Sequence, residues 1–329
     1  MGHGGGGRTM AQLIEDIFLY HLDNPMLRAG NDQALFEVRA GRMVITTDGH
    51  VVSPLFFPGG DIGSLAVHGT INDVAMSGAE PLYLSASFIL EEGFPLADLD
   101  RIVESMARAS REAGVPVVTG DTKVVERGKA DGVYIATTGV GRVPEGVQID
   151  ARQARPGDAI LINGTIGDHG VAIMSSRQGM AFESSVQSDS AALHTLVAEM
   201  VRVAPDIRCM RDATRGGLSA TLNELARQSG VGMLLQEAEL PVLPEVEAAC
   251  ELFGLDPLHV ANEGKLVAIV PRERVDGLLE TMRKHPLARA AACIGEVTED
   301  EHHFVQMATR FGGRRMVDWL AGEQLPRIC

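Results

Sequence analysis

The chain has 329 residues, of which 45% are apolar, and a formal net charge of -15 at pH 7. This length suits about two domains, and the apolar share is large enough for each to bury a core. The acidic balance argues against a nucleic-acid or anionic-membrane surface, because such surfaces need basic patches. No apolar run approaches membrane-spanning length and no secretory leader is recognisable, so we expect a cytoplasmic protein with neither nucleic acid nor membrane as a partner.

The N-terminal segment is rich in glycine and includes Gly4, Gly5 and Gly6. Thr9 then stands three residues before Gln12, which is typical of a capping box, and apolar residues follow at helical spacing. A glycine-rich loop that runs into a helix N-terminus can bind phosphate through its backbone N–H groups. A floppy tail or a cloning remnant would explain the same residues equally well.

Strands and helices are predicted to alternate from about residue 33 to 142. The predicted strands cover 43–47, 82–90, 115–119 and 133–138, and the predicted helices cover 62–76 and 96–106. The stretch 143–158 contains two prolines and two glycines, so it is the best candidate for a linker.

A second block of alternating elements runs from about 159 to 310. The predicted strands cover 159–162, 265–270 and 292–297, and the predicted helices cover 191–203, 217–229 and 273–284. Gly312 and Gly313 interrupt the pattern, and we expect a short tail after them.

The four cysteines are Cys209, Cys250, Cys293 and Cys329. None belongs to a C-x-x-C pair, so neither a zinc site nor a thioredoxin-like site is expected. The first three lie in or beside apolar segments, as reduced core cysteines do. Cys329 is the last residue, which makes it either part of a frayed end or a thiol carried on a flexible arm. A prenylation signal is excluded, because it needs its cysteine four residues from the end.

Five aspartates sit beside small residues at the predicted ends of strands or helices: Asp32, Asp48, Asp73, Asp121 and Asp212. A single aspartate next to glycine is most often a turn former. Five such positions in one chain, together with a glycine-rich opening, favour another interpretation. Carboxylates gathered on a hard cation are the usual way to hold Mg²⁺ against nucleotide phosphates.

The order of these segments and their residues resemble those of the ATP-using superfamily that includes aminoimidazole ribonucleotide synthetase and selenophosphate synthetase. Within it, the chain is most similar to the HypE family of hydrogenase maturation proteins, the carbamoyl dehydratases. The resemblance covers essentially the whole chain and rests on residues 3–8, 156–170, 212–218, 262–264 and 326–329. Selenophosphate synthetases usually carry a reactive Cys or selenocysteine near the N-terminus, and here no cysteine precedes Cys209.

The resemblance implies an α+β, two-domain PurM-like fold. It divides the chain into a glycine-rich phosphate-binding segment and helix (1–32), an ATP-binding and dimerisation domain (33–145), a C-terminal domain (146–311) and a flexible tail (312–329). The first domain is expected to contribute strands to a β-barrel shared across a homodimer. The second is expected to pack a mixed sheet against helices, with the nucleotide in the cleft between the domains.

The activity that the resemblance implies is an ATP-dependent dehydration on the chain's own tail. The HypF carbamoyltransferase loads a carbamoyl group onto Cys329, ATP phosphorylates the amide oxygen, and loss of phosphate leaves a thiocyanate. The cyano group then passes to an iron centre on a HypC–HypD complex, for a [NiFe]-hydrogenase. The cofactors implied are ATP and Mg²⁺.

Site residues follow from the same resemblance. The implied metal ligands are Asp32, Asp48, Asp73 and Asp212. Glu263 is the candidate base and Lys123 the candidate for steadying developing charge, although without the family they would read as a surface carboxylate and a solvated lysine. The residues expected to bind the nucleotide are Gly4, Gly5, Gly6, Asp32, Asp48, Asn72, Asp73, Gly120, Asp121, Thr122 and Asp212.

Two other functions stay open at this point. A small-molecule kinase or synthetase of the same superfamily would act on an untethered substrate, and its ATP turnover would survive removal of Cys329. A non-catalytic thiol carrier would present a modified Cys329 to a metal-assembly complex without losing water from it.

Overall fold

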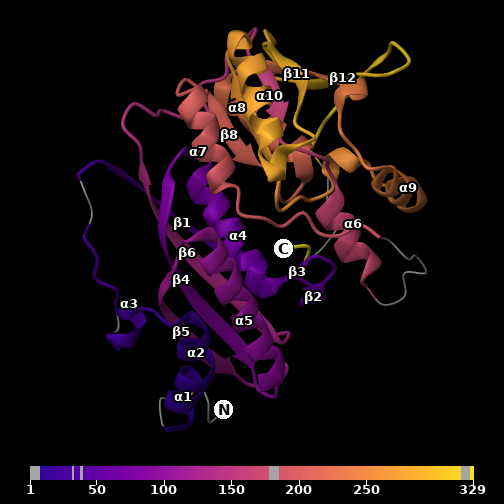
Figure 1. Cartoon of the computed structure of the whole chain (residues 1–329). Helices are drawn as coiled ribbons and strands as arrows, with labels where there is room; N and C mark the ends of the chain where they lie inside the picture. The colour runs from indigo at the N-terminus through magenta and orange to yellow at the C-terminus, as the bar shows by residue number, and fades with distance from the viewer. Residues whose placement is uncertain (1–7, 32, 38–39, 178–184, 320–326) are drawn as a thin grey trace.

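The computed structural model describes the chain except for residues 1–7, 32, 38–39, 178–184 and 320–326. Figure 1 shows two α+β halves, one above the other, and each is built on its own sheet. This confirms the predicted two-domain α+β architecture. No helix within the described ranges is long and apolar enough to cross a membrane.

The N-terminal half contains a four-stranded sheet with the order β1-β6-β4-β5. Its strands are β1 (Arg42–His50), β4 (Glu80–Glu91), β5 (Val117–Val125) and β6 (Val133–Val143), and the short strands β2 (Phe56–Phe57) and β3 (Gly60–Asp61) pair separately. β4 and β5 are parallel, whereas β6 runs antiparallel to both β1 and β4. A parallel pair needs a crossover, which α5 (Leu96–Ala113) provides.

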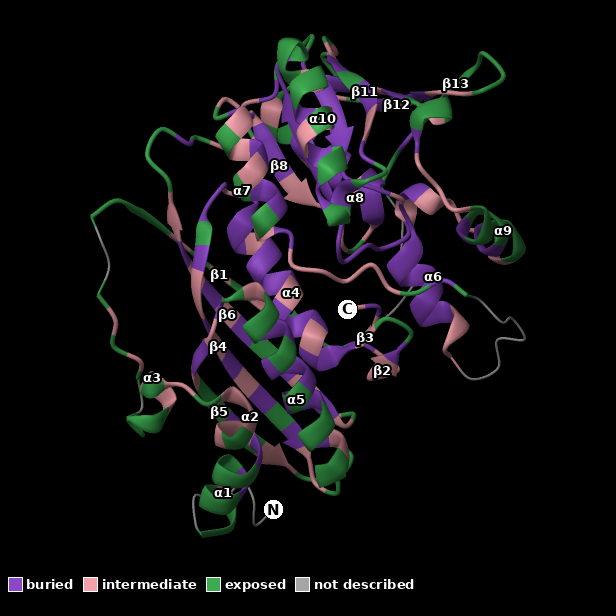
Figure 2. Cartoon of the chain, in the orientation of Figure 1, coloured by how far each residue is buried: buried purple, intermediate pink, exposed green. Residues whose placement is uncertain are grey.

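Two helices, α4 (Ile62–Ala75) and α5, cover one face of this sheet (Figure 1). Asp61 caps α4 by accepting from the N–H groups of Gly63 and Ser64. A Cβ at Gly63 would lie 2.2 Å from the carbonyl oxygen of Ile102, so the two helices approach closely there. Figure 2 shows α4 buried along most of its length and α5 exposed along one side.

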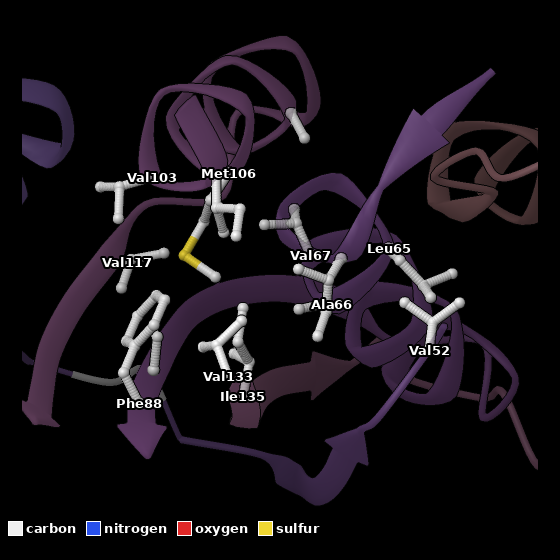
Figure 3. Close-up of a cluster of buried hydrophobic side chains, with 14 of the residues drawn as sticks. Val52, Leu65, Ala66, Val67, Phe88, Val103, Met106, Val117, Val133 and Ile135 are labelled. Carbon is white, nitrogen blue, oxygen red and sulfur yellow. The ribbon is translucent and has the colours of Figure 1, made fainter. Parts of the chain in front are cut away.

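The core of this half lies between α5 and the sheet. Figure 3 shows Phe88, Val133 and Ile135 on the strands facing Met106 of α5. All four side chains are at most 1% exposed. This cluster also takes in Ile328 from the far end of the chain, so the C-terminus is part of the N-terminal core.

Two predicted strands are longer in the structure than the sequence pattern indicated. β1 continues through Asp48 to His50, and β5 continues through Gly120 and Asp121 to Val125. Asp48 and Asp121 therefore lie within strands and not at strand ends, which corrects the prediction. The reason is pairing, because β6 supplies partners along the whole of β1 and β4 does the same for β5.

The first described helix also differs from the prediction. α1 spans Arg8–Leu13, so Thr9 lies inside the helix and is not its N-cap. A π-helical turn, Ile14–Leu19, follows and leads into α2 (Tyr20–Leu22), and α3 (Pro25–Arg28) comes next. Phe18 of the π-helical turn meets Phe88 of β4 edge to face at 5.0 Å, which anchors this segment on the sheet.

The C-terminal half contains a mixed seven-stranded sheet in the order β13-β12-β9-β11-β7-β10-β8. Its strands are β7 (Ala159–Ile162), β8 (Cys209–Asp212), β9 (Gly232–Gln236), β10 (Leu266–Val270), β11 (Ala292–Thr298), β12 (Val305–Ala308) and β13 (Arg314–Met316). Its helices are α6 (Asp168–Ser175), α7 (His194–Val203), α8 (Gly217–Ser229), α9 (Pro244–Phe253) and α10 (Val275–Lys284). The predicted linker, 143–158, has neither helix nor strand after Val143.

The tail is shorter than predicted. Gly312 has a φ of +85° and turns the chain between β12 and β13, so Arg314–Met316 belong to the sheet. Val317 is 1% exposed and therefore also belongs to the folded domain. Residues 327–329 are folded back against the N-terminal half through hydrogen bonds to Val51 and Ser53. Neither these residues nor 314–317 fit the predicted flexible tail of 312–329.

Candidate functional site

A cleft of about 780 Å³ lies where the two halves meet. It is lined by β1 and α4 from the N-terminal half, and by β8 and the start of α8 from the C-terminal half. Glu263 and Cys329 complete the lining, and the cleft surface is mainly polar. The cleft therefore brings together residues that are almost 300 positions apart in the chain.

Three of the predicted carboxylates line this cleft: Asp48 of β1, Asp73 of α4 and Asp212 at the end of β8. The hydroxyl of Thr46 donates to Asp73 at 3.0 Å and orients it. Burial, together with the charges of Asp73 and Asp48, raises the pKa of Asp212 to about 7. Burial also raises the pKa of Asp73. Crowded carboxylates raise one another's pKa values, and a bound cation would relieve their repulsion.

The carboxylates suit Mg²⁺ that is bound together with a nucleotide, and they do not form a closed cage. Among the described residues, no three histidine, cysteine or acidic side chains converge tightly enough to hold a metal unaided. Mg²⁺ characteristically takes one or two protein carboxylates and completes its shell with water and substrate phosphates. Asp48, Asp73 and Asp212 are the residues that would hold it here. Asp32 lies outside the described residues.

Cys329 is held at the edge of the cleft by hydrogen bonds from the backbone. An oxygen of its terminal carboxylate accepts from the N–H of Val51 at 3.1 Å, and the carbonyl of Arg327 accepts from the N–H of Ser53 at 3.0 Å. The tip of the chain thus runs alongside residues 51–53, which directly follow β1. The side chain of Ile328 is 4% exposed and lies in the N-terminal core.

His169 fixes the middle of this tip. Its Nε2 donates to the carbonyl oxygen of Ile328 at 2.7 Å, while its Nδ1 accepts from the hydroxyl of Ser188 at 2.7 Å. Burial lowers the pKa of His169, so the ring is neutral and the bond to Ile328 needs its N–H on Nε2. His169 had no assigned role in the sequence, and the structure makes it the anchor of the terminal residues.

The thiol of Cys329 lies next to the carboxyl group of Glu263. Burial and the neighbouring Glu263 raise the pKa of Cys329 far above its usual value. Burial, followed by the charges of Asp212, Asp189 and Asp48, raises the pKa of Glu263 well above its usual range. One carboxyl oxygen of Glu263 is buried without a hydrogen-bond partner among the described residues, so it is available to a group on the sulfur.

A buried polar network holds Glu263 in place. The backbone N–H of Glu263 donates to Asp189 at 3.0 Å, and Lys265 donates to the other oxygen of Asp189 at 2.8 Å. Asn72 donates to the carbonyl oxygen of Glu263 at 3.2 Å and is itself 1% exposed. Asn72, predicted to bind the nucleotide, is not among the residues that line the cleft, and in this structure it positions Glu263.

The remaining predicted residues lie elsewhere. Lys123 and Asp121 form an exposed ion pair on β5, with Nζ and Oδ2 2.6 Å apart. Gly120 and Thr122 neighbour them on the same strand, and none of the four lines the cleft of its own chain. Gly4, Gly5 and Gly6 lie outside the described residues.

Three residues of the cleft were missed by the sequence reasoning: Arg215, Thr46 and His50. His50 is 2% exposed, and its Nε2 lies 3.7 Å from Oδ2 of Asp48, so this buried ring packs against the carboxylate. Arg215 lies in the segment 212–218, which carries part of the family resemblance, but only Asp212 of that segment was predicted to belong to the site. Thr46 immediately precedes the Thr47-Asp48 pair and carried no signal of its own.

Comparisons with known proteins agree with this geometry. The model for the AIR synthase related protein N-terminal domain matches residues 30–143, and the model for the C-terminal domain matches residues 155–308. The chain is 70% identical to the carbamoyl dehydratase HypE of Cupriavidus necator, over 100% of this chain and 94% of that protein.

Solved structures resemble the chain equally well. A crystal structure of the hydrogenase maturation protein HypE in complex with ATP has a TM-score of 0.96 and 50% identity, and covers 100% of this chain and 99% of that one. A structure of a HypE–HypF complex matches with a TM-score of 0.83 and 47% identity, and covers 94% of this chain and 99% of that one.

Proposed function

The chain belongs to the HypE carbamoyl dehydratase family of AIR synthase related proteins, and we propose that it uses ATP to dehydrate an S-carbamoyl group on its own Cys329 to a thiocyanate. The product would supply cyanide ligands for the iron of a [NiFe]-hydrogenase. The observation that carries this proposal is the position of Cys329. Its thiol lies beside Glu263, in the same cleft as Asp48, Asp73 and Asp212.

In the first step, the amide oxygen of the carbamoyl group attacks the γ-phosphorus of ATP, and ADP leaves with the electrons of the broken P–O bond. Phosphoryl transfer depends mainly on positioning and on neutralising charge. The docked tip, held through Val51, Ser53 and His169, positions the carbamoyl group. Bound Mg²⁺ would neutralise phosphate charge, and Asp48, Asp73 and Asp212 would hold it.

In the second step, the C–O bond breaks and its electrons leave with the phosphate. The nitrogen loses its two protons, one to Glu263 and one to the departing phosphate, and the C≡N bond forms. Glu263 is the residue that receives a proton. The raised pKa of Glu263 makes its carboxylate a strong base once it is ionised. The charges of Asp212 and Asp48 are among the causes of the raised pKa. A cation bound by these two aspartates would therefore favour the ionised form of Glu263. One oxygen of Glu263 is buried without a hydrogen bond among the described residues, and its neighbour is the sulfur that would carry the carbamoyl group.

Loading of Cys329 requires the tip to leave the cleft. A structure of a HypE–HypF complex exists for a relative of 47% identity, which supports HypF as the carbamoyl donor here. The tip is docked in the cleft in this structure, and we propose a second, released state that would present Cys329 to HypF. We extend the proposal to a HypC–HypD complex as the acceptor of the cyano group and to the cytoplasm as the location.

A homodimer is the assembly that best suits the four-stranded sheet. α4 and α5 cover one face of the sheet, and the other face exposes apolar side chains, with Ile45 72% and Ile89 40% exposed. The register pairs Ile89 with Lys123, so Lys123 lies on this open face. We propose that a second copy covers the face to complete a barrel, and that Lys123 serves a site only within that dimer.

The proposed function is tested by the intact mass of the protein carbamoylated on Cys329, followed after addition of Mg-ATP. The proposal predicts the loss of one water for each carbamoyl group, and no loss without ATP. A carbamoyl mass that persists would favour the thiol carrier. ATP turnover that continues undiminished in Cys329→Ala would favour the kinase with an untethered substrate.

A further inference from the structure

Arg215 is a positively charged residue of the cleft whose side chain has no bonded partner among the described residues. The cleft is lined by two arginines, Arg211 and Arg215. Arg211 is paired with Glu224, with Nη2 and Oε2 2.6 Å apart. Within the part of the chain that the structure describes, Arg215 has no hydrogen bond and no ion pair, although five acidic side chains line the same cleft. A guanidinium that stays unpaired beside carboxylates is available for the anionic oxygens of a ligand.

The backbone holds Arg215 in a fixed place. Gly216 and Gly217 follow it with φ values of +75° and +62°, and they turn the chain into α8. A Cβ at Gly217 would lie 2.6 Å from the carbonyl oxygens of Leu258 and Val260, so this turn is packed tightly and admits only glycine there.

The segment that carries Arg215 is tied to the segment that carries Glu263. The N–H of Ala213 donates to the carbonyl of Lys265 at 3.0 Å, and the N–H of Asn262 donates to the carbonyl of Ala213 at 3.1 Å. The side chain of Asn262 donates to the same carbonyl at 2.9 Å. The positions from which Arg215 and Glu263 project are therefore set relative to each other, in the cleft that Cys329 also lines.

We propose that Arg215 is a further catalytic residue, which binds the oxygen that leaves the carbamoyl group. It would hold this oxygen in both steps, first as the amide oxygen that attacks phosphorus and then as the bridging oxygen that departs with phosphate. Negative charge accumulates on the phosphoryl oxygens and on the leaving oxygen, and the guanidinium neutralises it. Glu263 receives one of the two protons from the nitrogen.

The electrostatics of the cleft agree with this assignment. The charge of Arg215 acts to lower the pKa of both Glu263 and Cys329, against the larger effect of burial. Its charge thus acts on the sulfur that would carry the carbamoyl group and on the proposed base. Since the guanidinium is planar and presents two parallel N–H donors to an oxyanion, lysine at this position would replace it only in part.

The inference rests on the proposed function, and the experiment separates the two. Arg215→Gln, Arg215→Lys and Arg215→Ala are carbamoylated on Cys329, and water loss is timed by intact mass at saturating Mg-ATP. ATP binding is measured separately by equilibrium dialysis. Arg274→Gln is the matched control, because Arg274 is paired with Asp206 on the surface and does not line the cleft. Wild-type protein that loses no water would overturn the proposed function itself.

For Arg215→Gln we expect dehydration slowed by about 10²–10³-fold, as when one charge-stabilising donor is removed from an active site. ATP binding should change little, Arg215→Lys should retain part of the rate, and added guanidinium should partly restore Arg215→Ala. Dehydration by Arg215→Gln at the rate of wild type and of Arg274→Gln would overturn the inference. It would be overturned equally if the lost rate were fully explained by weaker ATP binding.

Discussion

Replacing Ile328 by alanine should release the tip of the chain from the cleft. Ile328 is 4% exposed and packs in the N-terminal core with Ile173 and Ala261. Removing such a side chain costs about 2–5 kcal/mol in a core, and the lower value suits a terminal segment that can relax. About 2 kcal/mol corresponds to a shift of roughly thirtyfold in the equilibrium between docked and released tips.

The assay is the rate at which a maleimide labels Cys329, resolved by peptide mass spectrometry so that the other three cysteines do not interfere. Docking protects this thiol by burial and by the raised pKa that burial and Glu263 produce, so labelling reports the released state. We expect Ile328→Ala to be labelled about thirtyfold faster than wild type, while its thermal stability stays close to that of wild type.

Leu252→Ala serves as the control, because Leu252 is 67% exposed on α9 and contributes nothing to docking. Equal labelling rates in wild type and Ile328→Ala would refute the reasoning. The tip would then be released already in wild type, or held without the help of Ile328.

Three more predictions concern the base, the metal carboxylates and the dimer. Glu263→Gln should slow dehydration by about 10²–10⁴-fold, measured by intact mass at saturating ATP, and an unchanged rate would exclude Glu263 as the base. The pKa of Asp212 is raised to about 7, so the metal-free protein should lose stability as pH rises from about 4 to 7, by at most about 4 kcal/mol. Thermal melts of Asp212→Asn should lack this loss, and an identical pH profile would contradict it. Ile45→Glu should turn a dimer into a monomer in light scattering, whereas Leu252→Glu should not, and a dimeric Ile45→Glu would argue against the open sheet face as the interface.

The regular elements could be predicted because their signals are local. The alternation from Leu82 to Leu90 and the amphipathic spacing of α5 each follow from one buried face, and both elements were found where the pattern indicated. The ends of β1 and β5 could not be predicted, since pairing with β6 and β4 fixes them and a partner strand is invisible in local sequence.

The site could be predicted only in part, for a similar reason. Small neighbouring residues made Asp48, Asp73 and Asp212 recognisable in the sequence, and all three line the cleft. The role of His169 depends on a contact with Ile328, 159 residues away, and no spacing rule links the two. The importance of the tip was visible in the sequence, but its inward position depends on the packing of Ile328 in a core built by another domain.

Following the oxygen of the carbamoyl group tests the central claim most directly. Protein carrying an ¹⁸O-labelled carbamoyl group on Cys329 is mixed with Mg-ATP in unlabelled water, and inorganic phosphate is examined by mass spectrometry. Transfer of oxygen to phosphorus in this cleft predicts one ¹⁸O in each phosphate formed and a thiocyanate left on Cys329. Unlabelled phosphate, formed while the thiocyanate appears, would contradict the account.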